Sequence, residues 1–239
     1  MARPDVPLTN ILPNLMTVTA ICAGLTSIRY GLQGNFELAV LLILLAALLD
    51  GLDGRLARLL DSDSAVGAEL DSLADFLNFG VAPGLLLYFW ALDETPRVGW
   101  IAVLVYAVCC VLRLARFNVT AKSGEAREDE YFVGIPSPAG AMLVLWPMFL
   151  SFATDSGPII HGHLLAIYMA LIGGLLISRI PTWSFKTLNI PRDGVRYVLV
   201  AFAFTGAAVL TYPWVTLVLG TLFYVGLVIW SLIGAGRRG

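Results

Sequence analysis

The sequence predicts an all-α membrane protein, a polytopic helix bundle with about eight transmembrane helices. Of its 239 residues, 58% are hydrophobic and only 13% are charged, with a mean hydropathy of +0.82, whereas a soluble domain carries about 25% charged residues. The apolar segments are also close to the roughly 20 residues that a membrane-spanning helix needs. Strand-like alternation is absent, so helices rather than a β-barrel are expected to satisfy the backbone.

The first three helices are separated by short breaks. Three prolines within residues 1–13 predict an interfacial N-terminal segment, and the first helix follows over about residues 14–31. A Gly-Asn pair then precedes the second helix, about residues 36–59. The polar link 61–64 separates it from the third helix, about residues 65–91. A link this short predicts that the second and third helices form an antiparallel hairpin.

The next three helices are recognised by the polar sequence between them. The fourth covers about residues 98–118 and is followed by the longest hydrophilic stretch of the chain, residues 120–131. The motif Gly134-Ile-Pro-Ser-Pro138 precedes the fifth helix, about residues 139–153, and the sixth covers about residues 164–178. Glycine and proline between apolar runs are typical of such boundaries.

The last two helices form a separate C-terminal pair. A link with two prolines, residues 179–193, leads to a helix over about 195–211, and Pro213 separates that helix from the last one, which ends near residue 233. We therefore expect a core over residues 14–185 and a C-terminal helix pair within 186–239.

The basic residues predict the orientation of this bundle. With the N-terminus in the cytoplasm, thirteen of the fifteen lysines and arginines fall on the cytoplasmic side, and only Arg29 and Arg97 fall on the other. This asymmetry follows the positive-inside rule and predicts a multi-pass protein of the cytoplasmic (inner) membrane. No basic stripe or cluster occurs, which excludes a nucleic-acid-binding surface.

Four aspartates stand out at the junction of the second and third helices. Asp50 and Asp53 are three residues apart, and Asp71 and Asp75 are four apart, so each pair lies on one helix face. The hairpin is expected to bring the two pairs together. Each carboxylate costs about 2.5–3.5 kcal/mol inside a membrane helix, and a hard cation, Mg²⁺ or Mn²⁺, is the partner that suits four oxygen ligands.

Small residues and one arginine accompany the aspartates. Gly54, Ala57 and Gly67 leave bare helix surface for close packing or for a ligand. Arg58 offers a planar fork that suits phosphate. Carboxylates, metal, glycines and arginine together indicate a substrate with a pyrophosphate group held by metal.

Two other interpretations compete with this one. The aspartates would be merely solvated if the hairpin ended in water. They would instead form an ion or proton pathway if the protein were an ion-coupled transporter. A transporter spreads polar groups through the membrane depth, whereas here the acids cluster at one end of two helices, which favours an enzyme.

The spacing of these residues resembles a known signature. Asp50-x-x-Asp53-Gly54-x-x-Ala57-Arg58, eight residues, Gly67, three residues, Asp71, three residues, Asp75 is similar throughout to the motif of the CDP-alcohol phosphatidyltransferase family. The resemblance implies an integral membrane enzyme that transfers a phosphatidyl or similar group from a CDP-linked donor to an alcohol and releases CMP.

Further segments resemble one branch of this family, the membrane-integral bacterial phosphatidylserine synthases (CDP-diacylglycerol–serine O-phosphatidyltransferases). They are residues 12–17, 67–75, 79–83, 113–119 and 132–138. The branch implies CDP-diacylglycerol as the donor and L-serine as the acceptor. Transfer to a phosphorylated polyol, glycerol 3-phosphate or an inositol phosphate, is the alternative within the same reaction class.

The resemblance also implies roles for single residues. Asp75 would be the general base that accepts the proton of the acceptor hydroxyl. Asp50, Asp53 and Asp71 would hold metal, with Asp75 as a ligand of a second ion. The expected CDP site consists of Gly54, Ala57, Arg58 and Gly67. Members of the family are commonly homodimers.

Other polar residues are weaker candidates. Asn14 and Thr17 either cap the first helix or contact cytidine. Arg113 and Arg116 are expected to bind the serine carboxylate or a donor phosphate. For Arg179 and Lys122, serine or phosphate binding competes with simple membrane anchoring and with a solvated loop. The tryptophans near expected span ends are interpreted as interfacial residues, Trp146 among them.

Overall fold

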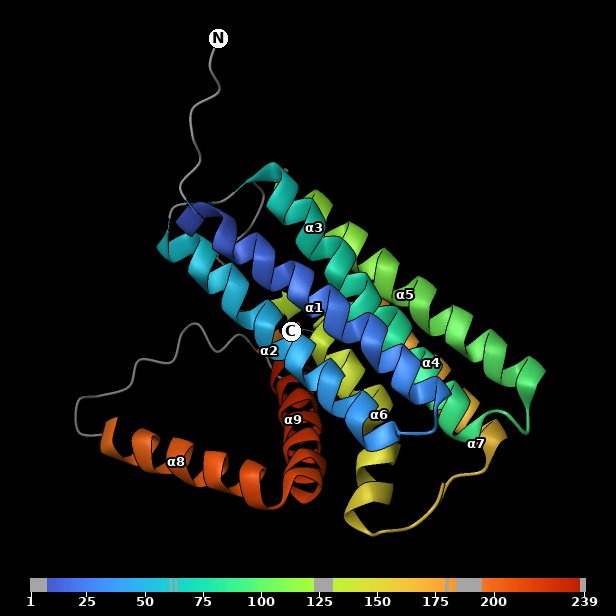
Figure 1. Cartoon of the computed structure of the whole chain (residues 1–239). Helices are drawn as coiled ribbons and strands as arrows, with labels where there is room; N and C mark the ends of the chain where they lie inside the picture. Colours follow the sequence, from blue (N-terminus) through green and yellow to red (C-terminus); the bar gives the residue numbers. More distant parts are fainter. Residues whose placement is uncertain are drawn as a thin grey trace.

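The computed structural model describes residues 8–60, 62, 64–122, 131–178, 181–183 and 195–236. This part of the chain folds into a bundle of helices with one very short sheet (Figure 1). The elements are α1 (Leu8–Leu32), α2 (Phe36–Leu59), α3 (Ala65–Asp75), the π-helical segment η1 (Phe76–Val81), α4 (Ala82–Ala91), α5 (Pro96–Lys122), β1 (Tyr131–Val133), α6 (Ser137–Ala153), α7 (Gly162–Ile177), β2 (Pro181–Trp183), α8 (Val195–Thr211) and α9 (Pro213–Gly236).

Two features differ from the sequence-based expectation. α1 begins at Leu8 rather than near Asn14, and Pro13 lies inside it. As the sixth residue of α1, Pro13 lies past the first turn, so the helix lacks the hydrogen bond that an N–H at this position would donate to the Thr9 carbonyl. β1 and β2 pair antiparallel, with Tyr131 opposite Trp183. The sequence predicts neither strand, because three residues carry too little alternation to be detected.

The third expected helix is continuous from α3 to α4 but contains the π-helical segment η1. Asn78 of η1 is fully buried, and a Cβ added at Gly24 of α1 would lie only 2.0 Å from its Oδ1. The Tyr106 hydroxyl of α5 donates to the Phe79 carbonyl at 2.7 Å. Such π-turns often occur at functional sites, and this one follows Asp75 directly.

The core lies between α4, α5, α6 and α7. Its largest fully buried side chains include Leu86, Leu87, Tyr106, Leu145, Met148, Phe149, Leu165 and Met169. α5 and α7 pack closely at Gly173. A Cβ added at this glycine would lie only 3.2 Å from the Tyr106 backbone. α1 and α2 pack together through small side chains, Ala20, Ala23 and Ala46. This frame fixes the neighbouring ends of α2 and α3.

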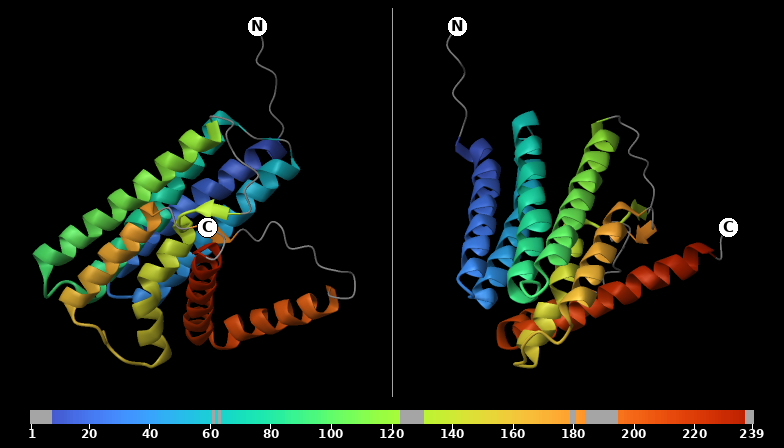
Figure 2. Two further views of the ribbon diagram at one scale, coloured as in Figure 1. Left: turned by 180° about the vertical axis from the view of Figure 1, so that it is seen from behind. Right: turned by 90° about the vertical axis from the view of Figure 1, so that its right-hand side faces the viewer.

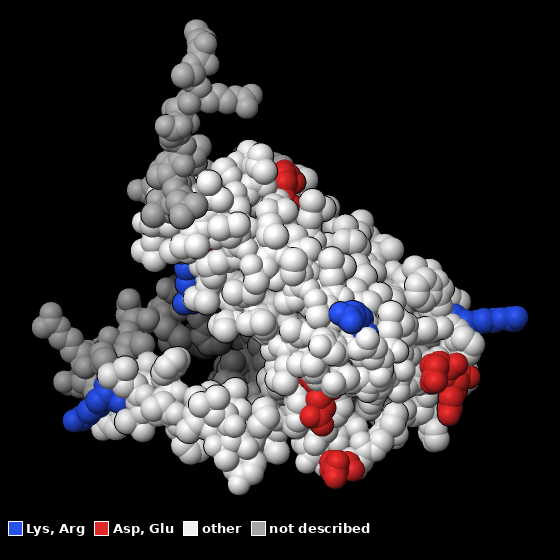
Figure 3. All heavy atoms as spheres, viewed as in Figure 1, with Lys and Arg blue, Asp and Glu red and all other residues white. Residues whose placement is uncertain are grey.

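The outer surface of the bundle is apolar. Large exposed hydrophobic side chains occur on nearly every helix, among them Leu48, Leu73, Ile101, Leu171, Phe202 and Leu210. On the face shown in Figure 3, only a few charged side chains interrupt the uncharged surface. A surface of this kind is stable in lipid and not in water, so the protein is an integral membrane protein.

Four helices are long and apolar enough to cross a membrane. They are Ile11–Leu32, Ala65–Ala91, Pro96–Thr120 and Pro213–Ile233. Three further apolar helices are shorter, namely Ser137–Ala153, Gly162–Ile177 and Arg196–Thr211. α2 has 24 residues but carries Glu37, Asp50 and Asp53. Four helices long enough to span a membrane are thus present in the described part of the chain.

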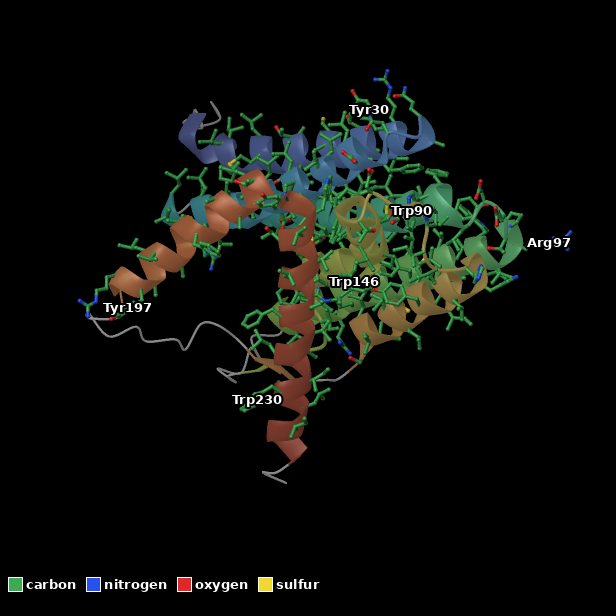
Figure 4. All side chains as sticks on the ribbon, turned by 90° about the horizontal axis from the view of Figure 1, so that it is seen from below. Tyr30, Trp90, Arg97, Trp146, Tyr197 and Trp230 are labelled. Carbon is green, nitrogen blue, oxygen red and sulfur yellow. The ribbon has the colours of Figure 1, made fainter. Side chains whose placement is uncertain are left out.

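The C-terminal helices lie at the side of the bundle. α9 contacts α6 and β2, whereas α8 contacts α9 and projects away from the other helices (Figure 2). Between Arg196 and Thr211, only Ala208 is even half-buried. In Figure 4 the labelled Tyr197 lies at the outer end of α8, far from the core.

Candidate active site

The aspartates of the α2–α3 hairpin lie near one another in the structure. Carboxylate oxygens of Asp50, Asp53 and Asp71 all lie within 4.8 Å of one another. Asp53 is buried and the other two are half-buried. Two helices therefore contribute carboxylates from opposite chain directions, and α2 and α3 each pack against α1.

Asp75 lies one helical turn after Asp71 and interacts with Asp50 and Asp71, but it is not one of the three acids whose carboxylate oxygens lie within 4.8 Å of one another. Its carboxyl group shares a hydrogen bond with Asp50, and its Oδ1 is buried with no hydrogen-bond partner among the described residues. A hydrogen bond between two carboxyl groups requires a proton on one of them. A cation at the same place removes that requirement and compensates the mutual repulsion of the acids.

α1 supports this cluster from one side. The hydroxyl of Thr17 is 2.6 Å from Asp53 Oδ2, and both residues are buried. A hydrogen bond to a charged acceptor is stronger than a neutral one, so Thr17 holds the Asp53 carboxylate in place. Thr17 therefore contacts the aspartate cluster, in addition to the Pro13 carbonyl of its own helix.

Asn14 and Gly67 also face each other across α1 and α3. A Cβ added at Gly67 would lie 2.8 Å from Asn14 Oδ1 and 3.0 Å from Ser64 Oγ. Ser64 caps the N-terminus of α3 by accepting a hydrogen bond from the Gly67 N–H at 3.0 Å. Gly67 is thus needed for the close approach of α1 to the capped start of α3.

Gly54 has a different environment from Gly67. Within the described part of the chain, a Cβ added at Gly54 would contact no other residue within 4 Å, so packing between these residues does not explain the glycine. Arg58 donates from Nε to the Gly54 carbonyl at 2.9 Å and is exposed, and Ala57 beside it is half-buried. Open backbone next to an arginine leaves room for a phosphate-bearing ligand beside the aspartates.

The two arginines of α5 make different contacts. Arg113 donates from Nη1 to Ser137 Oγ at 2.5 Å and interacts electrostatically with Asp75. Arg116 donates to the carbonyls of Ile177 and Ser178, at 3.1 and 3.3 Å, and so caps the C-terminal end of α7. Arg113 thus adjoins the aspartate cluster, and Arg116 ties α5 to α7.

These contacts predict separate effects of the two arginines. We expect Arg116→Ala to lower the thermal unfolding temperature in detergent, because two α7 carbonyls lose their donor. We expect Arg113→Ala to lower catalytic turnover more than stability. Measuring both quantities for both variants checks this, and equal losses of stability and activity in the two would contradict the assignment.

Two weaker candidates contribute less. Lys122 is the last residue of α5, and its side chain lies outside the described residues, as does the whole of Arg179. Two neighbours of Arg113, Ser137 and Tyr224, could not be predicted from the sequence. Ser137 belongs to the Gly-Ile-Pro-Ser-Pro motif, but nothing in its spacing points to Arg113, and Tyr224 is an isolated tyrosine in an apolar helix.

Comparison with known proteins places this site in a family. The family model described as CDP-alcohol phosphatidyltransferase matches residues 10–178, which include all four aspartates. The chain belongs to this family. The matched region of this CDP-alcohol phosphatidyltransferase contains the whole α2–α3 hairpin, together with Arg113 and Ser137.

Several similar proteins share one name. A protein of Mycobacterium leprae is 46% identical over 217 residues, 90% of this chain and 72% of the relative. A protein of Mycobacterium tuberculosis is 44% identical over 206 residues, 85% of this chain and 72% of the relative. A protein of Bacillus subtilis is 39% identical over 178 residues, which are 74% of this chain and 92% of the relative. Each is named CDP-diacylglycerol–serine O-phosphatidyltransferase.

The residues present fit the metal dependence that is general in this family. All candidate ligands are carboxylate oxygens, which suit hard divalent cations. The Oδ1 of Asp75, buried without a partner among the described residues, is the kind of acceptor that a cation or a substrate proton satisfies. The site therefore combines an acidic cluster suited to a divalent cation, an adjoining arginine and open backbone at Gly54.

Proposed function

We propose that this chain is a CDP-diacylglycerol–serine O-phosphatidyltransferase, which makes phosphatidylserine and CMP. Support for the reaction class comes from the convergence of Asp50, Asp53 and Asp71 in a CDP-alcohol phosphatidyltransferase. Support for serine as the acceptor comes from the shared name of relatives that cover 85–90% of this chain.

The proposed reaction is a direct displacement. Asp75 accepts the proton of the serine hydroxyl, and the hydroxyl oxygen attacks the phosphorus that carries the diacylglycerol. The bond from that phosphorus to the oxygen of CMP breaks, and CMP leaves. No covalent bond to the enzyme forms. Holding the hydroxyl and the phosphorus together supplies several kcal/mol of the rate enhancement, which compensates for a carboxylate that is only a modest base.

Metal and substrate contacts divide among the residues of the site. Asp50, Asp53, Asp71 and Asp75 would hold two ions, Mg²⁺ or Mn²⁺, and bound ions of this kind polarise phosphoryl oxygens and neutralise a leaving phosphate. Thr17 orients Asp53. Arg113, fixed by Ser137, would bind the serine carboxylate or the donor phosphate.

The CDP part of the donor is assigned to the open side of the hairpin. Gly54, Ala57, Arg58 and Gly67 would line this part, with Asn14 beside Gly67. The backbone space at Gly54, where an added Cβ meets nothing within 4 Å, supports this placement. Arg58 lies beside it and is suited to a phosphate.

The proposal extends to the membrane setting. We infer about eight membrane-spanning helices, a multi-pass protein of the cytoplasmic membrane with its aspartates facing the cytoplasm, and a homodimer. The core over residues 14–185 would carry the chemistry, and the helix pair within 186–239 would complete the membrane part. The charge asymmetry of the sequence supports the orientation.

The choice of acceptor is open to a direct test. Purified protein in detergent, with CDP-diacylglycerol and Mg²⁺ or Mn²⁺, is offered serine, glycerol 3-phosphate or an inositol phosphate separately, and CMP is measured. We expect release with serine alone. Release with a phosphorylated polyol would overturn the acceptor but keep the reaction class. No release with any acceptor, from folded protein, would favour a transporter.

A further inference from the structure

An apolar cavity lies apart from the aspartate cluster, between α6, α7 and α9. It has a volume of about 370 Å³, which lies in the size range of ligand pockets. Its lining includes the apolar residues Leu143, Ile172, Leu175, Val225 and Val228. A groove of this size in a membrane protein is suited to hydrocarbon.

Two polar atoms in the lining lack partners. Trp146 Nε1 and the Tyr224 hydroxyl are buried and have no hydrogen bond within the described residues. Buried donors without partners are costly, so their presence in an otherwise apolar cavity points to a ligand with acceptors. The sequence predicts Trp146 at a membrane interface, and in the structure its side chain packs against the core and lines this cavity beside α9 (Figure 4).

The cavity is linked to the aspartate cluster through one residue. Arg113 lies close enough to both Asp75 and Tyr224 for its charge to act on each of them. Ile135, at the cavity, is two residues from Ser137, which binds Arg113. An anionic group at Arg113 would therefore have the aspartates on one side and the apolar cavity on the other.

From this arrangement we propose that the cavity between α6, α7 and α9 binds an acyl chain of the CDP-diacylglycerol donor. The donor has a diphosphate, which suits the metal site and Arg113. Its ester carbonyls are acceptors for the Tyr224 hydroxyl and Trp146 N–H, and its hydrocarbon suits the lining. A bulk phospholipid has no diphosphate to connect the cavity with the aspartates. The inference rests on the proposed function for the identity of the donor.

Fluorescence quenching tests occupancy without any turnover. CDP-diacylglycerol with brominated acyl chains is added in detergent micelles, and the signal of Trp146 is taken as the difference between wild type and Trp146→Phe. We expect saturable quenching that excess unbrominated donor reverses. Phosphatidylglycerol with the same brominated chains, at the same mole fraction, should leave Trp146 unquenched while it quenches Trp230, which is 76% exposed. Equal quenching of Trp146 by both lipids, or by neither, would overturn the proposal.

A pocket-filling substitution provides a second, independent test. Val228→Phe places a larger side chain in the cavity, and Leu219→Phe is the matched control, because Leu219 lies on the same helix, is 60% exposed and does not line the cavity. We expect Val228→Phe to weaken binding of a long-chain donor about tenfold and to leave a dihexanoyl donor unaffected. Identical affinities in the two variants would contradict acyl-chain binding here. Because donor binding is measured, a failure of serine transfer would remain a separate result.

Discussion

Replacing Asp75 with asparagine is expected to lower the rate of serine-dependent CMP release by about 100- to 10,000-fold, the usual contribution of a general base. Asparagine keeps the size of the side chain and a carbonyl acceptor, but it cannot accept a proton from the serine hydroxyl. The Oδ1 of Asp75, which has no hydrogen-bond partner among the described residues, is the atom to which we assign that proton. Turnover at saturating substrates is the measurement.

Two controls separate this effect from misfolding. Glu37→Gln changes an acid on α2 that is exposed and lies at the opposite end of that helix from Asp50, and it should leave turnover unchanged. The unfolding temperature of Asp75→Asn should not fall below that of wild type, because the substitution neutralises one of four acids that repel one another. A folded Asp75→Asn variant that retains turnover within tenfold of wild type would remove Asp75 from the role of base.

Removing the divalent cation is expected to abolish CMP release, and adding Mg²⁺ or Mn²⁺ should restore it. Binding of the cation should also raise the unfolding temperature, because a ligand at 100 times its Kd stabilises the folded state by about 2.7 kcal/mol. Asp71→Asn should lose both effects. Asp71 is preferred because Asp53 is also bonded to Thr17 and Asp50 to Asp75, so changing either would disturb a second group.

The cation titration compares the Glu37→Gln and Asp71→Asn variants with wild type. The Glu37→Gln protein should show the same cation-induced rise in unfolding temperature as wild type, and Asp71→Asn should show little or none. If Asp71→Asn responded to Mg²⁺ and Mn²⁺ as strongly as wild type, the cluster of Asp50, Asp53 and Asp71 would not be the site of the cation.

The meeting of the aspartates could be predicted because it depends on local sequence. Spacings of three and four place each pair on one helix face, and the short link after residue 60 requires an antiparallel hairpin. The contacts of α1 were harder to predict. Thr17 and Asn14 were only candidates, since nothing in the sequence shows which face of α1 meets the hairpin.

Contacts between distant helices could not be predicted. Arg113 and Arg116 are three residues apart, and the sequence treats them alike, yet one bonds Ser137 and the other the end of α7. The choice depends on how α5 packs against α6 and α7. For the same reason, the position of Trp146 at a cavity and the projection of α8 from the bundle became visible only in the structure.

Isotope exchange distinguishes direct attack of serine on the donor from a reaction through a covalent enzyme intermediate. Labelled CMP and CDP-diacylglycerol are incubated with the purified protein and divalent cation, without serine or phosphatidylserine. We predict no label in CDP-diacylglycerol until phosphatidylserine is added, because only the reverse reaction can then incorporate CMP. Label that appears with CMP and CDP-diacylglycerol alone would demonstrate a phosphatidyl-enzyme intermediate and contradict the account.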